Sequence, residues 1–232
     1  MERVLLVSPH PDDAELAMGG TIAKMIDAGW DVTIVDLTDG EPTPFGSKQL
    51  REKEAGKASM LLGVKNRMCL EMPNRYLQVT LENRRKLAEV IRLNKPDLLF
   101  GPAMPDYHPD HIATAELTSG ARFEAKFHKT NMAAEPHWAS RKYDYYSTHR
   151  LTYDKPSFVV DVTDYWDKKM NAVRAYQSQI KNISPPNAVS LVEKVEVVGR
   201  YFGQCAGFKY GEPFVGYEAI PVKNIKLLVT SP

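Results

Sequence analysis

The sequence predicts an α/β protein with a Rossmann-like, doubly wound, mostly parallel sheet, helices on both faces and a small C-terminal α+β extension. Short apolar runs such as Val4–Val7 alternate with segments of helical period through residue 100, and this alternation is typical of βαβ units. Acid-containing loops follow several of these runs directly. Open α/β sheets place their ligand sites at the carboxyl ends of the strands, where such loops begin.

Four strands are predicted in the first 100 residues. Each is short and largely apolar, as expected of strands that are buried on both faces. The helices between them stop at Gly29, at Gly63 and before Pro96, which are residue types that end helices. The predicted strands are residues 4–7, 31–37, 64–70 and 97–100, and the predicted helices are residues 22–26, 48–62 and 81–93.

The second half of the chain has a less regular pattern, and residues 124–142 look irregular and exposed. Thr163 is a candidate N-cap, because a threonine there can accept a backbone N–H. The sequence contains no internal repeat, low-complexity tract or linker, so residues 1–232 are expected to form a single domain. The predicted helices are residues 112–123, 163–179 and 189–202, and the predicted strands are residues 143–148 and 158–162, with loop and strand from residue 208 onward.

The composition is that of an ordinary soluble globular protein, with 43% apolar and 25% charged residues. The net charge of +1 predicts neither nucleic-acid nor membrane binding. No apolar run approaches the roughly 20 residues of a bilayer span, and no signal peptide is recognisable. We therefore expect a cytoplasmic protein. Cys69 and Cys205 form no disulfide framework or CxxC pattern and are interpreted as reduced thiols of the core.

The stretch Ser8–Glu15 follows the first predicted strand and contains a histidine, two adjacent aspartates and a glutamate. Its prolines stiffen the loop and bias the residues before them toward extended conformations. Gly19 and Gly20 lack the GxGxxG spacing of a dinucleotide loop, and the acids before them would repel a pyrophosphate. The stretch instead has the residue types that hold a metal ion beside a carboxylate base.

A second cluster, Asp106–His111, follows the fourth predicted strand and precedes a helical run. Loops from one edge of a sheet can converge although about 100 residues separate them in sequence. Catalytic zinc sites typically use three His, Asp or Glu ligands and leave the fourth position for water. The candidate ligands are His10 and Asp13, on a rigid loop, and His111 from the second cluster.

Three neighbouring residues could take part in hydrolysis. Asp12 could accept a proton from water, and His108 could stabilise an oxyanion or protonate a leaving amine. Asp110 is placed to orient one of the imidazoles. His149 is a further candidate on the substrate side, because it ends a predicted strand. A lone histidine is more often an ordinary polar loop residue, and two others are interpreted in this way, His128 and His137.

The motifs His10–Glu15 and His108–His111 resemble those of the PIG-L/LmbE-like N-deacetylase family, and the likeness covers nearly the whole chain. The chain most resembles the bacillithiol-pathway branch, which removes acetate from N-acetylglucosaminyl-malate. Other relatives act on the mycothiol precursor, on N-acetylglucosaminyl-phosphatidylinositol or on chitin disaccharides. Further matching segments are residues 36–38, 51–55, 175–179 and 209–212.

The resemblance implies that His10, Asp13 and His111 bind zinc and that Asp12 is the general base. It also implies that His108 is the oxyanion stabiliser or acid, held by Asp110. A His₂Asp site accepts several divalent ions, so Fe²⁺ or another metal is an alternative to Zn²⁺. Homo-oligomers, trimers or hexamers, are also implied by resemblance.

The implied substrate contacts are less specific to the family. Arg51 would reach the sugar hydroxyls, and Tyr210 is a second candidate in a C-terminal loop. Tyr107 stands where the bacillithiol branch has an arginine, which weakens the case for an anionic, malate-bearing substrate. The remaining departures also lie outside the catalytic motifs, at Asp39, Asn74, Gly211 and Pro213.

We therefore expect a zinc-dependent hydrolase that removes the acetyl group from a small N-acetylglucosamine-type substrate, with no nucleic-acid or membrane partner. One alternative is a metal-dependent amidase or esterase for another acylated small molecule, such as an antibiotic or nucleoside. A second alternative is a sugar-binding protein without catalysis on the same scaffold.

Overall fold

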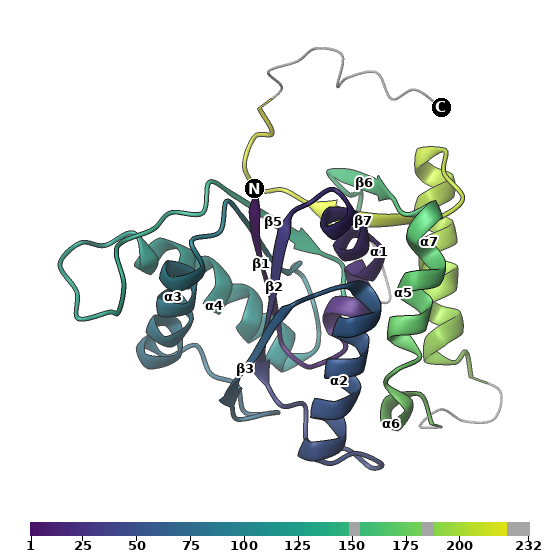
Figure 1. Ribbon diagram of the computed structural model, residues 1–232, viewed down its shortest axis with the longest axis horizontal. Helices are drawn as coiled ribbons and strands as arrows, with labels where there is room; N and C mark the ends of the chain where they lie inside the picture. Colours follow the sequence, from purple (N-terminus) through teal and green to yellow (C-terminus); the bar gives the residue numbers. More distant parts are fainter. Residues whose placement is uncertain (149–153, 182–187, 222–232) are drawn as a thin grey trace.

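The computed structural model describes residues 1–148, 154–181 and 188–221. Within these residues, seven strands form one sheet in the order β3-β2-β1-β4-β5-β7-β6 (Figure 1). The first five in this order run parallel, whereas β7 is antiparallel to both β5 and β6. The predicted mostly parallel α/β sheet is thus confirmed. The strands are Arg3–Ser8 (β1), Asp31–Thr38 (β2), Asn66–Met72 (β3), Leu98–Pro102 (β4), Arg141–Tyr145 (β5), Phe158–Asp161 (β6) and Gly211–Val215 (β7).

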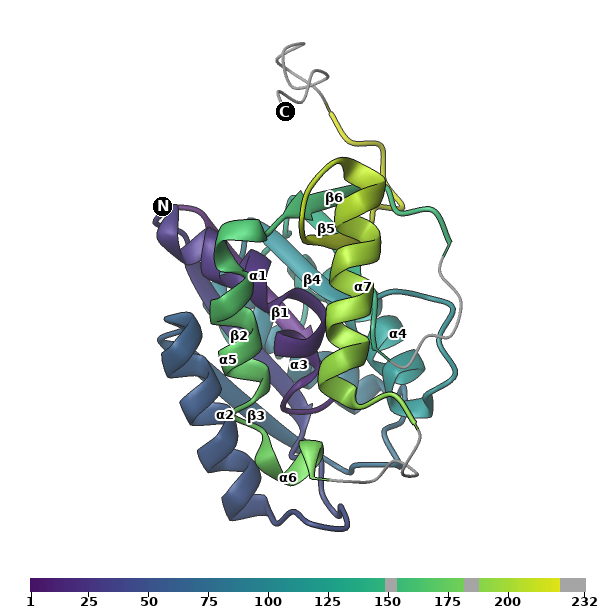
Figure 2. The same ribbon diagram turned by 90° about the vertical axis from the view of Figure 1, so that its right-hand side faces the viewer.

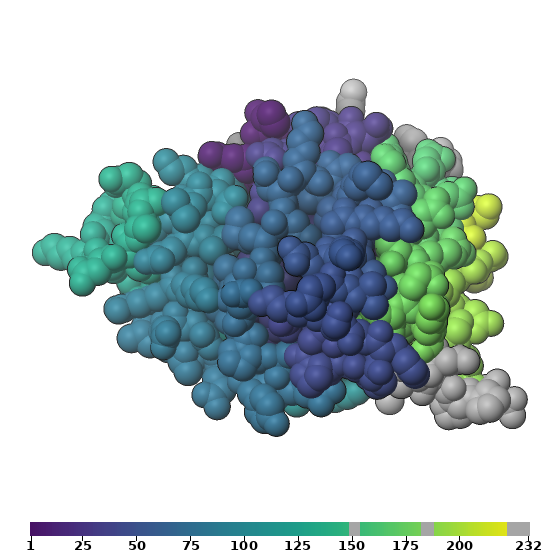
Figure 3. All heavy atoms as spheres, turned by 60° about the horizontal axis from the view of Figure 1, so that its bottom comes forward, coloured from purple at the N-terminus to yellow at the C-terminus, as the bar shows by residue number. Residues whose placement is uncertain are grey.

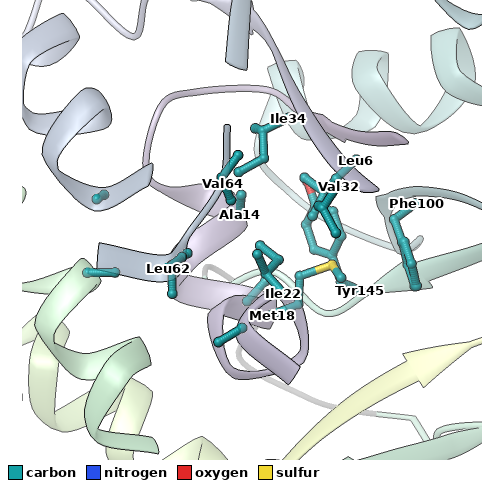
Figure 4. Close-up of a cluster of buried hydrophobic side chains, with 14 of the residues drawn as sticks. Leu6, Ala14, Met18, Ile22, Val32, Ile34, Leu62, Val64, Phe100 and Tyr145 are labelled. Atoms are coloured by element: carbon teal, nitrogen blue, oxygen red, sulfur yellow. The ribbon is translucent and has the colours of Figure 1, made fainter. Parts of the chain in front are cut away.

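Helices cover both faces of the sheet, with α3 and α4 on one side and α1, α2, α5 and α7 on the other (Figures 1 and 2). Successive side chains of β1 alternate between the two layers, as the pleat requires. Val4 and Leu6 pack in the cluster on the α1 side, in which Figure 4 labels Leu6. Leu5 and Val7 pack in the cluster on the α3–α4 side. The helices are Asp13–Asp27 (α1), Lys48–Leu62 (α2), Leu81–Asn94 (α3), Pro109–Ala125 (α4), Trp166–Val173 (α5), Gln177–Ile180 (α6) and Leu191–Ala206 (α7).

Several predicted boundaries were wrong, and two of them matter for the site. α1 starts at Asp13 rather than near residue 22, so Asp13 lies in the first turn of a helix and not on a loop. α4 likewise starts at Pro109, because His108 caps it and proline is favoured in a first helical turn. The predicted helix 163–179 is interrupted where Tyr176 leaves the helical conformation and donates its hydroxyl to buried Glu15.

Two smaller predictions also failed. Thr163 does not cap a helix with its side chain. Its hydroxyl donates to Asp161 and accepts the backbone N–H of Tyr210 at 3.3 Å instead of a helical N–H. Cys69 and Cys205 are exposed thiols rather than core residues. Cys69 lies on the edge strand β3, and Cys205 lies in the last turn of α7. None of the described helices is long and apolar enough to cross a membrane.

A buried ion pair bridges a kink in α1 at Met18, where φ is −139°. The Glu212 carboxylate accepts the backbone N–H groups of Gly20 and Thr21 at 2.9 and 2.6 Å. It also pairs with Lys169 Nζ at 2.7 Å. The carboxylate thus satisfies donors that the broken helical ladder leaves without intrahelical acceptors.

Replacing Glu212 with alanine is expected to lower the free energy of unfolding by about 3–5 kcal/mol, because the Lys169 ammonium would be left buried and unpaired. Urea titration of the purified protein measures this difference. The control is Glu196→Ala, which removes an exposed ion pair with Arg200 and is expected to cost about 1 kcal/mol or less. Equal losses in the two variants would contradict this account of the kink.

Candidate active site

Two loops from adjacent strands meet at the carboxyl edge of the sheet. β1 pairs with β4 in parallel, and Leu6 lies opposite Phe100 in that register. The segments that follow these strands, residues 9–12 and 103–108, therefore leave the sheet side by side. Figure 3 turns this edge toward the viewer, with the dark-blue atoms of α2 and the loop before it across the middle of the face.

The backbone between β1 and α1 is strained at Asp12, whose φ is +136°. A non-glycine residue with positive φ is uncommon and is often found at functional sites, where the surrounding structure holds it. Here the Asp12 carbonyl accepts the first helical N–H, from Leu16 at 2.9 Å, and Asp13 N–H donates to the His10 carbonyl. This conformation directs Asp12 and Asp13, although adjacent, to different partners.

The three predicted ligands lie together. Asp13 Oδ2 is 3.0 Å from His10 Nδ1 and 3.3 Å from His111 Nε2. One ligand atom from each residue lies within 4.8 Å of the others. Ligands bonded to one zinc ion at about 2.1 Å lie roughly 3.4 Å apart in a tetrahedral arrangement. The spacing in the structure therefore suits such an ion.

In each of the two histidines, the ring nitrogen that does not face Asp13 contacts a second carboxylate. His10 Nε2 lies 3.1 Å from Asp110 Oδ2, and His111 Nδ1 lies 3.1 Å from Asp106 Oδ2. Metal-binding histidines in proteins almost always make such an outer hydrogen bond, which fixes the ring orientation. The donor set thus fits a metal in its outer contacts as well as in its spacing.

A second trio, His10, His108 and Asp110, also meets the spacing for a metal ion. The Asp110 carboxylate, however, accepts the backbone N–H groups of Arg75 and Leu77 at 2.8 and 3.3 Å. His108 Nδ1 accepts the backbone N–H of Asp110 at 3.2 Å. A metal would have to compete with these hydrogen bonds, so the trio of His10, Asp13 and His111 fits better.

Buried carboxylates favour the protonated form of both candidate ligand histidines. Burial alone would lower the pKa of His10, but hydrogen bonds to Asp110 and Asp13 outweigh it and raise the pKa to about 9. Burial alone would also lower the pKa of His111, but the negative charge of Asp13 and the hydrogen bond to Asp106 outweigh it and raise the pKa to about 10. The cluster therefore favours positive charge, which a divalent cation would supply.

The Asp12 carboxylate contacts Arg51, whose Nη1 donates to Asp12 Oδ2 at 3.1 Å. Burial raises the pKa of Asp12 to about 6, although the positive charge of Arg51 opposes the shift. A carboxylate with a pKa close to neutrality suits a general base. Arg51 itself is buried, and its Nε lies 3.9 Å from Glu41 in the loop between β2 and α2.

The contacts of Arg51 predict a kinetic signature. Arg51→Met is expected to lower kcat about 10- to 100-fold, because a hydrogen bond to a charged group contributes about 1.5–3 kcal/mol. The KM should change by less than about threefold, because the guanidinium contacts Asp12 and not an open surface. A raised KM with unchanged kcat would instead support the predicted contact with the sugar hydroxyls. Steady-state kinetics with the preferred substrate distinguishes the two outcomes.

His108 lies against both candidate ligand histidines, with its ring centroid 5.0 Å from that of His10 and 4.6 Å from that of His111. Since His108 Nδ1 accepts the Asp110 N–H, the proton of a neutral ring lies on Nε2. His108 is therefore held by the backbone of Asp110, whereas the Asp110 carboxylate orients His10. The implied contact between His108 and Asp110 is therefore present, but it is made by the backbone N–H of Asp110 and not by its carboxylate.

Besides Arg51, the structure describes two of the predicted substrate residues, and they lie in different surroundings. Tyr107 is 57% exposed and directly precedes His108. Tyr210 is buried, with its ring stacked on Trp166 at 4.1 Å between centroids, in the cluster against α5 and α7. His149 lies outside the described residues. Of the two histidines interpreted as surface residues, His128 is exposed and His137 is half-buried.

Glu15 is the last acid of the first motif, and it turns away from the site. Its carboxylate accepts hydrogen bonds from Arg67 at 2.6 Å and from the Tyr176 hydroxyl at 3.1 Å. Arg67 also pairs with Asp36 on β2 at 2.7 Å. This buried network anchors the first turn of α1 to the sheet, and thereby supports Asp13. No pattern in the sequence indicated it, since Arg67 lies in a separate strand.

Asp106 and Ser147 were not assigned a role from the sequence. Asp106 belongs to the second cluster, but its spacing to His111 does not show which side chain it contacts. Ser147 lies just beyond β5 and carries no motif. Ser147 reaches Asp106 because β5 pairs with β4 in the sheet, and Asp106 in turn contacts His111.

Comparisons with known proteins show the family of this chain. A family described as PIG-L, GlcNAc-PI de-N-acetylase, matches residues 5–121. Diacetylchitobiose deacetylase of Thermococcus kodakarensis is 31% identical, over 91% of this chain and 82% of its own length. The Bacillus anthracis protein named "Probable N-acetyl-alpha-D-glucosaminyl L-malate deacetylase 2" is 29% identical, over 76% of this chain and 80% of its own. The crystal structure of a conserved protein from Thermus thermophilus matches with a TM-score of 0.86 and 37% identity, over 96% of this chain and 98% of its own. The chain therefore belongs to the PIG-L family.

Proposed function

We propose that the protein is a zinc-dependent N-deacetylase that converts an N-acetylglucosamine-type substrate to acetate and a free amine. The observation that carries the proposal is the trio of His10, Asp13 and His111, whose ligand atoms lie within 4.8 Å of one another beside the carboxylate of Asp12. Membership of the PIG-L family supports the same reaction. Fe²⁺ or another divalent ion could occupy the same ligands.

His10, Asp13 and His111 would hold the metal, which when bound lowers the pKa of water and polarises a carbonyl oxygen. Asp12 accepts the proton of the attacking water. Its carboxylate is partly exposed and its pKa is raised, and both properties suit a general base. His108 Nε2 donates to the carbonyl oxygen as negative charge develops on it, or to the leaving nitrogen. Each role therefore belongs to a separate side chain at one sheet edge.

The relatives support the substrate class that we propose. Two of them are named for diacetylchitobiose and for N-acetylglucosaminyl-malate, which share an N-acetylated glucosamine and differ in the group attached to it. We therefore propose that the acetylated amino sugar is the recognised part. Tyr107, in place of a cation beside His108, favours a neutral attached group over malate.

Acetate release from a panel of N-acetyl sugars tests the proposal. The panel includes N-acetylglucosamine, diacetylchitobiose and N-acetylglucosaminyl-malate, each with and without a chelator. We expect release from at least one member, loss of release with the chelator, and recovery on adding Zn²⁺. Metal binding without release from any member would favour an amidase or esterase for another acylated molecule, or a sugar-binding protein.

A further inference from the structure

Asp106 is buried beside the proposed metal ligands and contacts one of them. We propose that Asp106, anchored by Ser147, is a positioning residue that orients the His111 ring so that Nε2 faces the metal position. The inference rests on the proposed metal-dependent function. It assigns a role to two residues, from the ends of β4 and β5, that are not themselves ligands.

The contact between Asp106 and His111 is close and shielded from water. Asp106 Oδ2 lies 3.1 Å from His111 Nδ1, and both side chains are 0% exposed. The two nitrogens of an imidazole lie on different edges of the ring, so a partner on Nδ1 determines where Nε2 points. In the structure Nε2 lies 3.3 Å from Asp13 Oδ2, as the ligand role requires.

Asp106 is itself held by donors from two directions. The Ser147 hydroxyl donates to Oδ2, the oxygen that contacts His111, and the backbone N–H of His108 donates to Oδ1 at 2.9 Å. The segments that carry Asp106 and Ser147 are joined by a backbone hydrogen bond from Ala103 to Tyr145 at 2.8 Å. Both carboxylate oxygens therefore have donors, and the side chain has little freedom to rotate.

The other ligand histidine is supported in the same way. Asp110 Oδ2 lies 3.1 Å from His10 Nε2, and its carboxylate accepts the backbone N–H groups of Arg75 and Leu77. Each histidine thus has a carboxylate of its own, anchored by other donors. Asp106 thus supports His111 as Asp110 supports His10. Ser147, just beyond β5, donates the hydrogen bond that anchors Asp106.

A purely structural role for Asp106 is the competing explanation, since it also accepts a backbone N–H at the start of α4. Asp161 provides a matched control. Its Oδ1 accepts the N–H and the hydroxyl of Thr163, at 3.0 and 2.7 Å, with no histidine involved. Asp161→Asn keeps an acceptor oxygen for both donors. Asp106→Asn cannot keep an acceptor for each of its donors, because Asp106 accepts hydrogen bonds at both carboxylate oxygens and an amide has only one acceptor oxygen.

The test measures Zn²⁺ and Co²⁺ affinity by competition with a chelator, together with the visible spectrum of the Co²⁺ protein. Asp106→Asn is expected to weaken metal binding about 10- to 100-fold and to change the Co²⁺ spectrum, because the His111 ring is no longer held. Ser147→Ala should weaken metal binding less than Asp106→Asn does. Ser147→Thr, which keeps the hydroxyl, should bind the metal with wild-type affinity. Asp161→Asn should match the wild-type protein in both measurements.

Wild-type affinity and spectrum in Asp106→Asn would overturn the inference. If Asp106→Asn does not fold, the Ser147 pair decides: equal affinity in Ser147→Ala and Ser147→Thr, both at the wild-type value, would overturn it. A wild-type protein that binds neither metal would instead overturn the proposed function. The two failures are therefore distinguishable, and neither measurement depends on knowing the substrate.

Discussion

Asp12→Ala is expected to lower kcat by about 10²- to 10⁴-fold, the usual contribution of a positioned general base, while metal affinity stays within about threefold. The structure separates these two effects because Asp12 Oδ2 bonds Arg51, whereas Asp13 Oδ2 faces His10 and His111. Acetate release measures the first effect, and chelator competition measures the second.

Two variants control this experiment. Asp12→Asn keeps the size of the side chain and the strained cap position but not the basicity, so it should be nearly as inactive as Asp12→Ala. Asp167→Ala removes an exposed carboxylate on α5 and should leave both measurements unchanged. Full activity in Asp12→Asn would exclude Asp12 as the base, and lost metal in that variant would place it among the ligands.

His111→Ala is expected to weaken metal binding by more than the 10- to 100-fold that is typical of losing an outer hydrogen bond, and to reduce activity to background. His111 is fully buried between Asp13 and Asp106. Its removal takes away one candidate ligand and the ring that lies between two buried carboxylates. Metal content after purification and chelator competition provide the measurement.

The matched histidine is His137, whose Nε2 bonds the Pro96 carbonyl at the opposite edge of the sheet, before β4. His137→Ala should retain metal and activity. Full metal occupancy in His111→Ala would contradict the ligand assignment. Thermal unfolding of both variants without metal separates loss of a ligand from loss of the fold, since a folded His111→Ala that lacks metal supports the assignment.

The clustering of the three candidate metal ligands was predictable because local motifs and one topological rule were sufficient. Parallel strands end at a common edge of the sheet, so His10 and Asp13 after β1 and His111 after β4 could be placed together without coordinates. The distances of 3.0 and 3.3 Å around Asp13 agree with that expectation. The start of α1 was misplaced because the sequence reveals neither the positive φ at Asp12, after which the helix begins, nor the kink at Met18.

The partners of these residues were decided by the tertiary structure. The residues that could ligate a metal were evident from the sequence, because they follow strands and sit in compact motifs. The direction of each side chain depends on contacts across the sheet: Arg51 from α2 turns to Asp12, and Ser147 beyond β5 reaches Asp106. A hydrogen bond requires two groups within about 3 Å in the right orientation, and no spacing along the chain specifies that for residues on different strands. The sequence by itself thus determined which side chains could perform the chemistry, and the packing of the sheet and helices determined which of them hold the others in place.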